Sequence, residues 1–506
     1  MSAKTGKDAI AILLGSLSAP LIAFVMTPFY LKQLGIEGLG LVSLFTLLAT
    51  VLGIFVSGVS KTYQRDISHA QVAEPQNLLG LAKGGMLLFV GLGVVLAVAV
   101  HIFGYGQLRE LAGSSFTTDV LDRSVLLISI HLAGSICVGA LSATLSALRD
   151  QIVPSTVNLF TGVVTAILTW FVLSSTPRVD LFYLCQLAGM GLTLLFLAIR
   201  CRLVLISHLN GTTPATIFQA WKRRSGSSGK MSLILIGQEG LGVVISQIDR
   251  LLVTSTFPLA SLGTYNLAAN PSRLPGMITG PVNIVTFPEI CRLVGRQASK
   301  REVAEYLGRV TFFLFLLLSS AVIVIVPSAS ALLEIWLGKG NVPADAPLCF
   351  TILTVGQLLL ATAGPAYNLT VAHGKVGYGL VQNLVSIVVL PLLGLLLSRI
   401  WGLPGIALLW VIYSSTSTIV CSSVAYSRHA DPQVGLRWTG RTLLNLLLSG
   451  LVAFTLNLCH FTGWAMVGLS TSCALLFFFS AVVYQFGWRL TSLSRILDSE
   501  SGHQAV

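Results

Sequence analysis

Long, unbroken apolar runs separated by short polar segments dominate this chain. The runs of membrane-spanning length fall near residues 9–31, 40–60, 81–103, 124–147, 154–176, 179–200, 231–256, 263–287, 310–336, 348–372, 377–398, 404–427, 441–461 and 463–487. Each is close to the ~20 residues that an α-helix needs to cross a bilayer. Strands of a membrane β-barrel would instead alternate apolar and polar residues in short segments. The pattern therefore predicts an all-α polytopic membrane protein with about 14 transmembrane helices.

The composition agrees with that prediction and excludes a soluble globular domain. Of the 506 residues, 54% are hydrophobic and 10% are charged, whereas soluble chains carry about a quarter charged residues. The first run, Ala9–Leu31, is too long for a signal-peptide core and has no small-residue cleavage site, so we expect it to remain as the first helix. The eight cysteines are scattered without a CxxC or His/Cys cluster. That spacing predicts neither a disulfide framework nor a metal site.

The basic residues predict how the helices are oriented. The formal net charge is +12, but lysines and arginines gather between the apolar runs, so the membrane-orientation rule explains them better than a nucleic-acid partner does. With the N-terminus inside, 23 of the 31 basic residues fall in cytoplasmic segments and 6 in segments on the other side. We therefore expect both termini in the cytoplasm, in agreement with an even number of spans.

A basic break divides the chain into two similar halves. We predict an N-terminal lobe of six spans at 1–200, a cytoplasmic basic linker at 201–230, a C-terminal lobe of six spans at 231–430, and two extra spans with a cytoplasmic tail at 431–506. Leu34–Val42 aligns with Phe257–Tyr265 at an offset of 223 residues, which pairs Gly40 with Gly263. Six spans, an even number, separate the copies, so the halves share one orientation. Such a parallel duplication is typical of transporters.

Three ionisable residues lie inside the seventh apolar run. Glu239, Asp249 and Arg250 would be costly in lipid, so by default they indicate a polar cavity or a route through the protein. The two acids are ten positions apart, about 15 Å along a helix axis, and do not form a carboxylate dyad. Either could bind and release a coupling ion as its access alternates; the alternative is a fixed pair with a basic residue of a neighbouring helix. Arg250 is a candidate contact for an anionic substrate.

The eighth run carries a polar stripe. Asn266, Asn270 and Arg273 follow one another at i, i+4 and i+7, so they share one helix face, which we expect to point away from lipid. Prolines at 271, 275 and 281 interrupt this helix, and the freed backbone groups must line a cavity or find other partners. The planar fork of Arg273 suits phosphate oxygens, which makes it the first candidate for a diphosphate headgroup. The alternative is a structural salt bridge with Asp249 or Glu239.

Charged residues also end two spans on the predicted cytoplasmic side. Lys61, Arg65 and Asp66 follow the second run, and Arg149 follows the fourth. A basic mouth there would attract an anionic substrate from the inner leaflet, and Asp66 is a further candidate for ion coupling. Positive-inside anchoring explains each basic residue equally well.

Sequence motifs of enzymes are missing. The chain has no Walker loop, no GxSxG nucleophile elbow and no paired-histidine metal motif. We therefore expect a protein that is not an enzyme and needs no cofactor, and that uses a proton or sodium gradient as its energy source.

The openings of the two halves resemble a known family. The relevant stretches are TPFYL at 27–31, LGIEGLGLV at 34–42, SGVS at 57–60 and RDI at 65–67, then QIDRLL at 247–252 and LGTYNLA at 262–268. They are similar to the Wzx-type O-antigen and polysaccharide flippases of the multidrug/oligosaccharidyl-lipid/polysaccharide exporter superfamily. The resemblance covers about residues 9–430.

This resemblance implies two six-helix lobes around a central cavity. It also implies that the protein flips an undecaprenyl-diphosphate-linked oligosaccharide, such as an O-antigen unit of lipopolysaccharide, across the bacterial inner membrane by alternating access. A polysaccharide polymerase and other glycan-assembly proteins are the partners it implies. The two extra spans resemble the lipid II flippase branch. A cation-coupled multidrug exporter, by antiport, and a non-transporting scaffold of a glycan-assembly complex are the alternatives.

Overall fold

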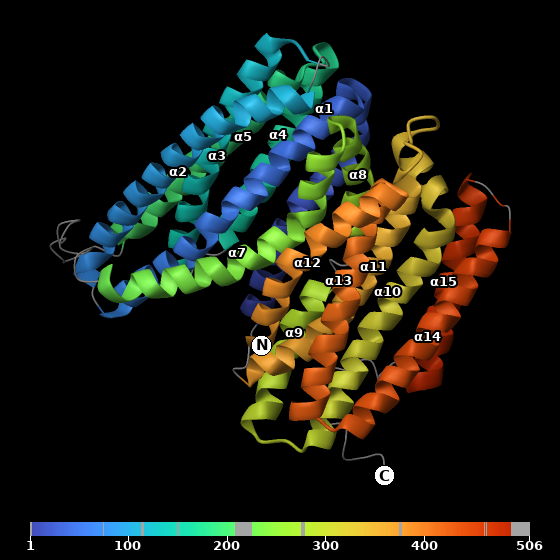
Figure 1. The fold of residues 1–506 in the computed structure, drawn as a ribbon. Coiled ribbons are helices and arrows are strands. Elements are labelled where there is room, and N and C mark those ends of the chain that lie inside the picture. The colour runs from blue at the N-terminus through green and yellow to red at the C-terminus, as the bar shows by residue number, and fades with distance from the viewer. Residues whose placement is uncertain are drawn as a thin grey trace. The chain divides into compact units, whose positions relative to one another are not determined.

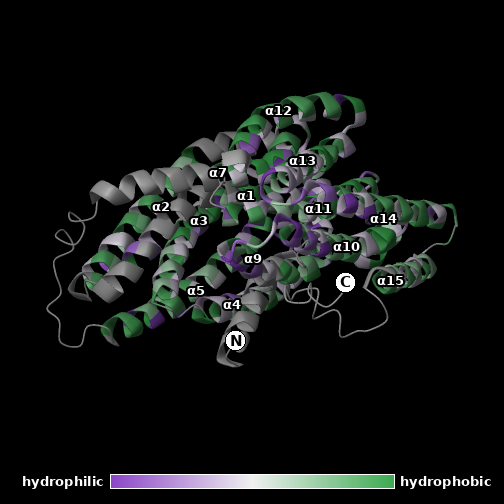
Figure 2. Ribbon diagram, turned by 90° about the horizontal axis from the view of Figure 1, so that it is seen from below, coloured by the Kyte–Doolittle hydropathy of each residue, from purple (hydrophilic) through white to green (hydrophobic). Residues whose placement is uncertain are grey.

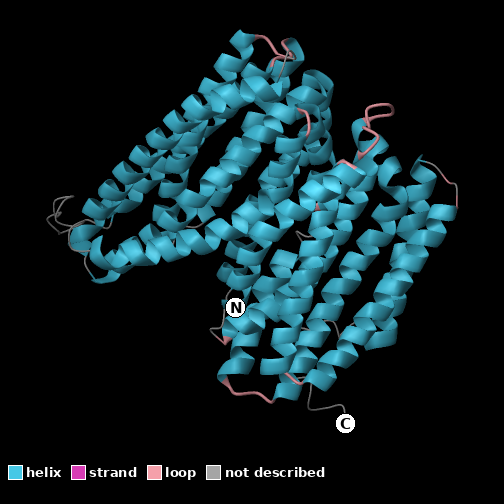
Figure 3. Cartoon of the chain, in the orientation of Figure 1, coloured by secondary structure: helices cyan, strands magenta, loops and turns pink. Residues whose placement is uncertain are grey.

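Helices make up nearly all of the structure, which is a computed structural model (Figures 1 and 3). It describes residues 3–73, 75–112, 116–148, 150, 152–207, 225–274, 279–373, 377–459, 461 and 463–486. By its internal contacts the chain divides into two compact units, Met1–Gly263 and Thr264–Val506.

The described part of unit 1 contains six helices, and unit 2 contains most of the others. Unit 1 holds α1 (Ala3–Ala73), α2 (Pro75–Ala112), α3 (Thr118–Ala147), α4 (Ile152–Ser175), α5 (Val179–Ser207) and α7 (Ser225–Thr256). Helix α8 (Leu259–Ser272) begins in unit 1 and ends in unit 2. Unit 2 continues with α9 (Thr279–Gly295), α10 (Lys300–Leu337), α11 (Ala346–Ala372), α12 (Gly377–Trp401), α13 (Leu403–Val424), the π-helix η2 (Ala425–His429), α14 (Pro432–Leu458) and α15 (Gly463–Phe486).

The predicted fold class, an all-α polytopic membrane protein, is confirmed. Among the described residues, 11 helical segments are long and apolar enough to cross a membrane, and hydrophobic residues cover most of the described helices in Figure 2. Each of the 14 predicted runs falls mainly on helix. The first two runs lie within α1, and the eighth is divided between α8 and α9.

Helix α1 is two helices joined at Gly35. The backbone of Gly35 has φ 71° and ψ 178°, which is not helical. Glycine adopts this positive φ readily because it has no Cβ. The kink therefore marks the boundary that the apolar pattern predicts between the first and second spans.

Gly40 and Gly263, which the sequence repeat aligns, lie at one close backbone contact within unit 1. A Cβ on Gly40 would collide with the carbonyl oxygen of Leu259, and a Cβ on Gly263 would lie 2.5 Å from the carbonyl oxygen of Ile36. Ile36 and Leu259 are themselves a pair at the 223-residue offset. The contact is therefore reciprocal, as expected where two-fold related segments meet, and only small residues allow helices to approach so closely.

Helix α7 belongs to unit 1. It packs against α1, and the two compact units divide after Gly263. The predicted lobes at 1–200 and 231–430 stay predictions. Part of the predicted linker, residues 208–224, lies outside the described residues.

Small and hydroxylated residues bring α4 and α5 together in unit 1. Thr193 donates a hydrogen bond to the hydroxyl of Thr161 across the two helices, at 2.8 Å. Gly189 leaves room for the side chain of Thr165, which a Cβ at that position would strike. Such contacts are typical of helix pairs in membranes, where close packing replaces the hydrophobic driving force.

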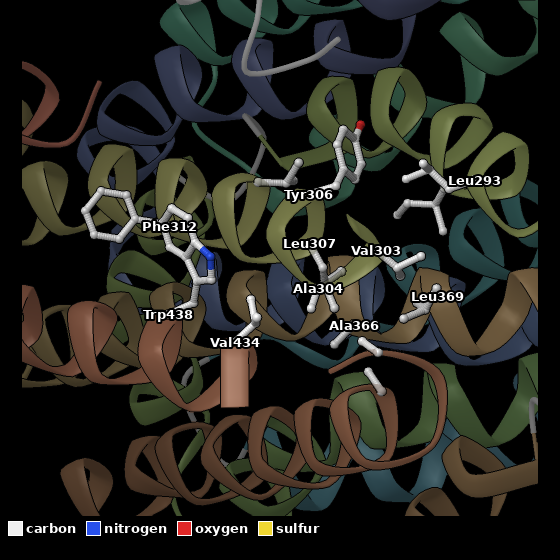
Figure 4. Packing of buried hydrophobic residues seen from close by; sticks show 14 of the residues in the cluster. Leu293, Val303, Ala304, Tyr306, Leu307, Phe312, Ala366, Leu369, Val434 and Trp438 are labelled. Carbon is white, nitrogen blue, oxygen red and sulfur yellow. The ribbon is translucent and has the colours of Figure 1, made fainter. Parts of the chain in front are cut away.

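Unit 2 has a buried apolar cluster built around α10 (Figure 4). Helices α9, α10, α11 and α14 and the π-helix η2 contribute to it; the labelled members are Leu293, Val303, Ala304, Tyr306, Leu307, Phe312, Ala366, Leu369, Val434 and Trp438. Helices α14 and α15 pack against α10, and a buried hydrogen bond of 2.8 Å joins Ser328 of α10 to Ser470 of α15. The two extra spans are therefore integral parts of this unit.

Substitution of Gly40 by alanine tests the reciprocal contact. Because the new Cβ would meet a backbone oxygen that cannot rotate away, we expect Gly40→Ala and Gly263→Ala each to destabilise the protein by about 1–3 kcal/mol. The measurement is thermal unfolding of the purified protein in detergent. Gly242→Ala in α7 is the matched control, since no heavy atom lies within 4 Å of a Cβ there. Equal melting temperatures for Gly40→Ala and Gly242→Ala would contradict the contact.

Candidate functional site

Two consecutive residues of α7 have opposite charges, and both are buried. Asp249 is 1% exposed and Arg250 is 4% exposed. Arg250 Nη1 donates to Oε1 of Gln247 at 2.8 Å, and Asp249 Oδ1 accepts the backbone N–H of Arg250 at 2.8 Å. Burying a charge is expensive unless hydrogen bonds compensate it. These short local bonds reduce that cost, so α7 carries a buried polar segment.

Gln247 is a member of this segment that our reading of the sequence did not single out. It is 4% exposed, and it lies three positions before Arg250, so both side chains occupy one helix face. The i, i+3 spacing of an amide and a guanidinium inside an apolar run is the signal that could have identified it. We define Gln247, Asp249 and Arg250 as the α7 polar segment.

The polar stripe of the eighth run lies in unit 2 and is graded in burial. Asn266 is buried, Arg273 is half-buried and Asn270 is exposed. Helix α8 ends at Ser272, and the next described helix, α9, begins at Thr279. The N–H groups of Arg273 and Leu274 donate to the carbonyls of residues 270 and 271, at 3.4 and 3.1 Å. Arg273 therefore sits where the proline-containing helix stops, as the proline positions predict.

The structure places the candidates of the predicted basic mouth only in part. The side chains of Lys61 and Arg65 lie outside the described residues, as does that of Glu239, and Arg149 lies outside them entirely. Asp66 is half-buried. The candidate residues are thus divided: Asp249 and Arg250 belong to unit 1, and the α8 stripe belongs to unit 2.

Other contacts organise the two ends of unit 1. Near the candidate mouth, the hydroxyl of Tyr63 lies 2.9 Å from that of Thr144 and donates to the carbonyl of residue 82 at 3.3 Å. Arg200 pairs with Asp150 at 2.8 Å. At the other end, Arg178 makes two hydrogen bonds to the carboxylate of Asp180, at 3.0 and 2.8 Å, and these bonds raise the pKa of Arg178. Asp180 is buried, so this pair is only partly exposed.

An apolar cavity of about 350 Å³ lies between α1 and α4 in unit 1. Its lining is entirely apolar: Leu21, Ile22, Val25, Met26, Val163, Ala166, Ile167 and Trp170. On α1 these residues lie between Pro20 and Pro28. Such a cavity suits a hydrocarbon chain, because it offers no partner to a polar group.

The described residues contain no group of three or more His, Cys, Asp and Glu side chains that could hold a metal ion. In unit 1 they contain the buried Asp249 and Arg250. In unit 2 they contain Arg273, directly after the end of α8. These residues stay the candidates for a binding site or an ion pathway, because ionisable groups in membrane helices by default indicate such a function.

Solved structures with the same fold are membrane transporters. An inward-facing multidrug resistance MATE family transporter of the MOP superfamily superposes with a TM-score of 0.66 at 14% identity, covering 83% of this chain and 98% of its own. The lipid II flippase MurJ, in an inward closed conformation, gives a TM-score of 0.63 at 13% identity, covering 94% of this chain and 99% of its own. The Vibrio cholerae MATE transporter VcmN gives 0.59 at 15% identity, covering 83% and 95%.

The comparison with curated proteins found no match. The comparison with family models found one that covers residues 5–294, more than half of the chain, and its description is polysaccharide biosynthesis protein. This chain, which shares the fold of the MOP superfamily transporters, therefore belongs to the polysaccharide biosynthesis protein family.

Proposed function

We propose that the protein is a flippase that moves an undecaprenyl-diphosphate-linked oligosaccharide, such as an O-antigen unit, from the cytoplasmic to the periplasmic leaflet of the bacterial inner membrane. One observation carries the proposal: a chain of the polysaccharide biosynthesis family has the fold of membrane transporters and flippases. A family of transporters that acts in glycan assembly has a lipid-linked saccharide as its natural cargo.

Arg273 is the residue that we assign to the diphosphate. It is half-buried and lies directly after the end of α8, so it combines partial desolvation with access. A guanidinium binds two phosphate oxygens at once, and desolvation strengthens this charge-assisted pairing. Asn270, which is exposed on the same helix face, would contribute polar contacts next to it.

We assign ion coupling to the α7 polar segment. Asp249 is the carboxylate there that could exchange a proton or a sodium ion, and the adjacent Arg250 is a counter-charge one residue away. A carboxylate buried in a membrane helix is costly and is retained where it carries a function. A gradient coupled at this point would drive alternation of the substrate site.

Two further observations support a substrate with a lipid tail. The cavity between α1 and α4 has room for hydrocarbon and no polar lining. The lipid II flippase covers 94% of the chain, whereas the MATE transporters above cover 83%. The two coverages differ by 11% of the 506 residues. This is about the length of the segment 432–486, which contains α14 and α15.

A cation-coupled multidrug exporter is the second candidate. The observation that favours it is the MATE transporter superposition, whose TM-score of 0.66 exceeds the 0.63 of the lipid II flippase. A drug exporter has no requirement for a phosphate-binding arginine, so Arg273 separates the two functions.

Glycolipid translocation in inverted membrane vesicles tests the flippase. Vesicles without the protein should fail to move the lipid-linked oligosaccharide into the lumen, and wild-type protein should restore the transfer. Arg273→Ala should lower the rate by about tenfold or more, since a hydrogen bond to a charged group contributes about 1.5–3 kcal/mol. Arg273→Lys should restore part of it, because lysine keeps the charge and loses the fork.

Arg301→Ala is the matched control, because Arg301 is an exposed arginine on α10. Resistance of the cells to cationic drugs should be the same for all of these variants. Full translocation by vesicles that lack the protein would reject the flippase. Loss of drug resistance with normal translocation in Arg273→Ala would establish the exporter instead.

Asp249→Asn tests the coupling role. We expect transport driven by an imposed proton or sodium gradient to fall to the rate seen without a gradient, because asparagine cannot change its charge with the bound ion. The rate is measured in vesicles with and without the gradient. Asp122→Asn, an exposed carboxylate on α3, should keep the full response. An undiminished gradient response in Asp249→Asn would place coupling elsewhere.

A further inference from the structure

Trp438 of α14 is held rigidly against α10 in unit 2. Its indole Nε1 donates to Oε2 of Glu305 at 2.8 Å, and its ring lies 5.8 Å from that of Phe312 (Figure 4). The ring also covers Gly308, where a Cβ would collide with it. Trp438 is 5% exposed. A side chain held by a hydrogen bond, a ring contact and a backbone contact is a fixed platform.

Two arginines are positioned by this platform. The guanidinium carbon of Arg441 lies 5.1 Å from the centroid of the Trp438 ring, and Arg437 Nη1 lies 3.6 Å from Oε1 of Glu305. The two arginines are four positions apart, so they share one face of α14, and both side chains are exposed. Glu305 pairs with Arg437, and no ion pair in the described part of the chain includes Arg441. The surface therefore keeps a net positive charge.

The depth of Arg441 in the membrane follows from the length of the helix beyond it. The apolar part of α14 from 442 to 458 has 17 residues, about 25 Å of helix. The hydrocarbon core is about 30 Å thick, so Arg441 lies at the boundary between hydrocarbon and headgroups. Its guanidinium must therefore reach the headgroup layer, as arginines at helix ends do.

Below Arg441 the same helix face carries exposed leucines. Leu444, Leu448 and Leu451 are 56%, 44% and 59% exposed. They follow Arg441 at intervals of three, seven and ten residues, which keeps them on one face. The last lies about 15 Å below Arg441 along the axis, which is the depth of one leaflet. We call Arg437, Arg441, Leu444, Leu448 and Leu451 the α14 face.

We propose that the α14 face binds one anionic phospholipid of the leaflet at which α14 begins, with its phosphate on the two guanidinium groups and an acyl chain along the leucines. The charge selects an anionic headgroup, and the leucine track one leaflet long selects a lipid over a soluble anion or an acidic protein. The site lies on unit 2 alone and does not depend on the flippase assignment.

The experiment measures how lipids stabilise the full-length protein in detergent. Dioleoyl phosphatidylglycerol should raise the melting temperature of the wild type, and dioleoyl phosphatidylcholine should not. The variant Arg437→Gln/Arg441→Gln should need at least about tenfold more phosphatidylglycerol to reach the same rise in melting temperature. The reason is that each arginine near an anionic headgroup contributes about 1 kcal/mol. Arg301→Gln, which removes an exposed charge from α10, should respond as the wild type does. Native mass spectrometry should show the same loss of bound lipid.

Arg441→Gln alone guards against misfolding of the double variant, because it leaves both contacts of Glu305, to Trp438 and to Arg437, in place. It should also weaken the response to phosphatidylglycerol. The proposal is overturned if these variants respond like the wild type. It is equally overturned if glycerol phosphate or inorganic phosphate stabilises the wild type as phosphatidylglycerol does, since the leucine track would then have no role.

Discussion

The close contact of two backbones at Gly40 and Gly263 constrains much of this structure. Gly40 lies against the carbonyl oxygen of Leu259, and Gly263 lies against that of Ile36. At the 223-residue offset Ile36 is equivalent to Leu259, as Gly40 is to Gly263. The duplicated segment is in contact with its own copy there. A side chain added to either glycine would therefore collide with the backbone of the other copy. The contact holds the start of α8 against the second half of α1, and α7, which ends just before α8, packs against α1 along its own length.

Charge inside the membrane is the second constraint, and the repeat makes it unequal between the copies. At the 223-residue offset, Asp249 and Arg250 correspond to Met26 and Thr27. Thr27 satisfies its hydroxyl within its own helix, donating to the carbonyl of residue 23, so the first copy needs no partner at this position. The second copy instead buries two charges and bonds them locally through Gln247 and a backbone N–H. The two copies therefore differ chemically, because only the second copy is charged at these positions. Helix packing does not require this difference.

The helices could be predicted from the sequence because a bilayer imposes one dominant requirement, a long apolar run, and every predicted run falls mainly on helix. The kink at Gly35 and the end of α8 after Pro271 were also predictable, because glycine and proline act on their own backbone. Which helices pack together was not. Helix α7 packs against α1, which is distant in the sequence, and Trp438 meets Glu305 across 133 positions. No local pattern encodes such a pairing.

The same division explains the candidate site. Asp249, Arg250, Asn266 and Arg273 could be found because a polar residue inside an apolar run is conspicuous, whereas Gln247 acquires meaning only through its bond to Arg250. The arginines of α14 show the opposite case. By sequence they are ordinary positive-inside residues, and only the fixed indole of Trp438 beneath Arg441 distinguishes them from other basic residues at helix ends. In this protein, polar groups within the membrane are identified by their position in the sequence, and polar groups at its surface by the side chains that hold them in place.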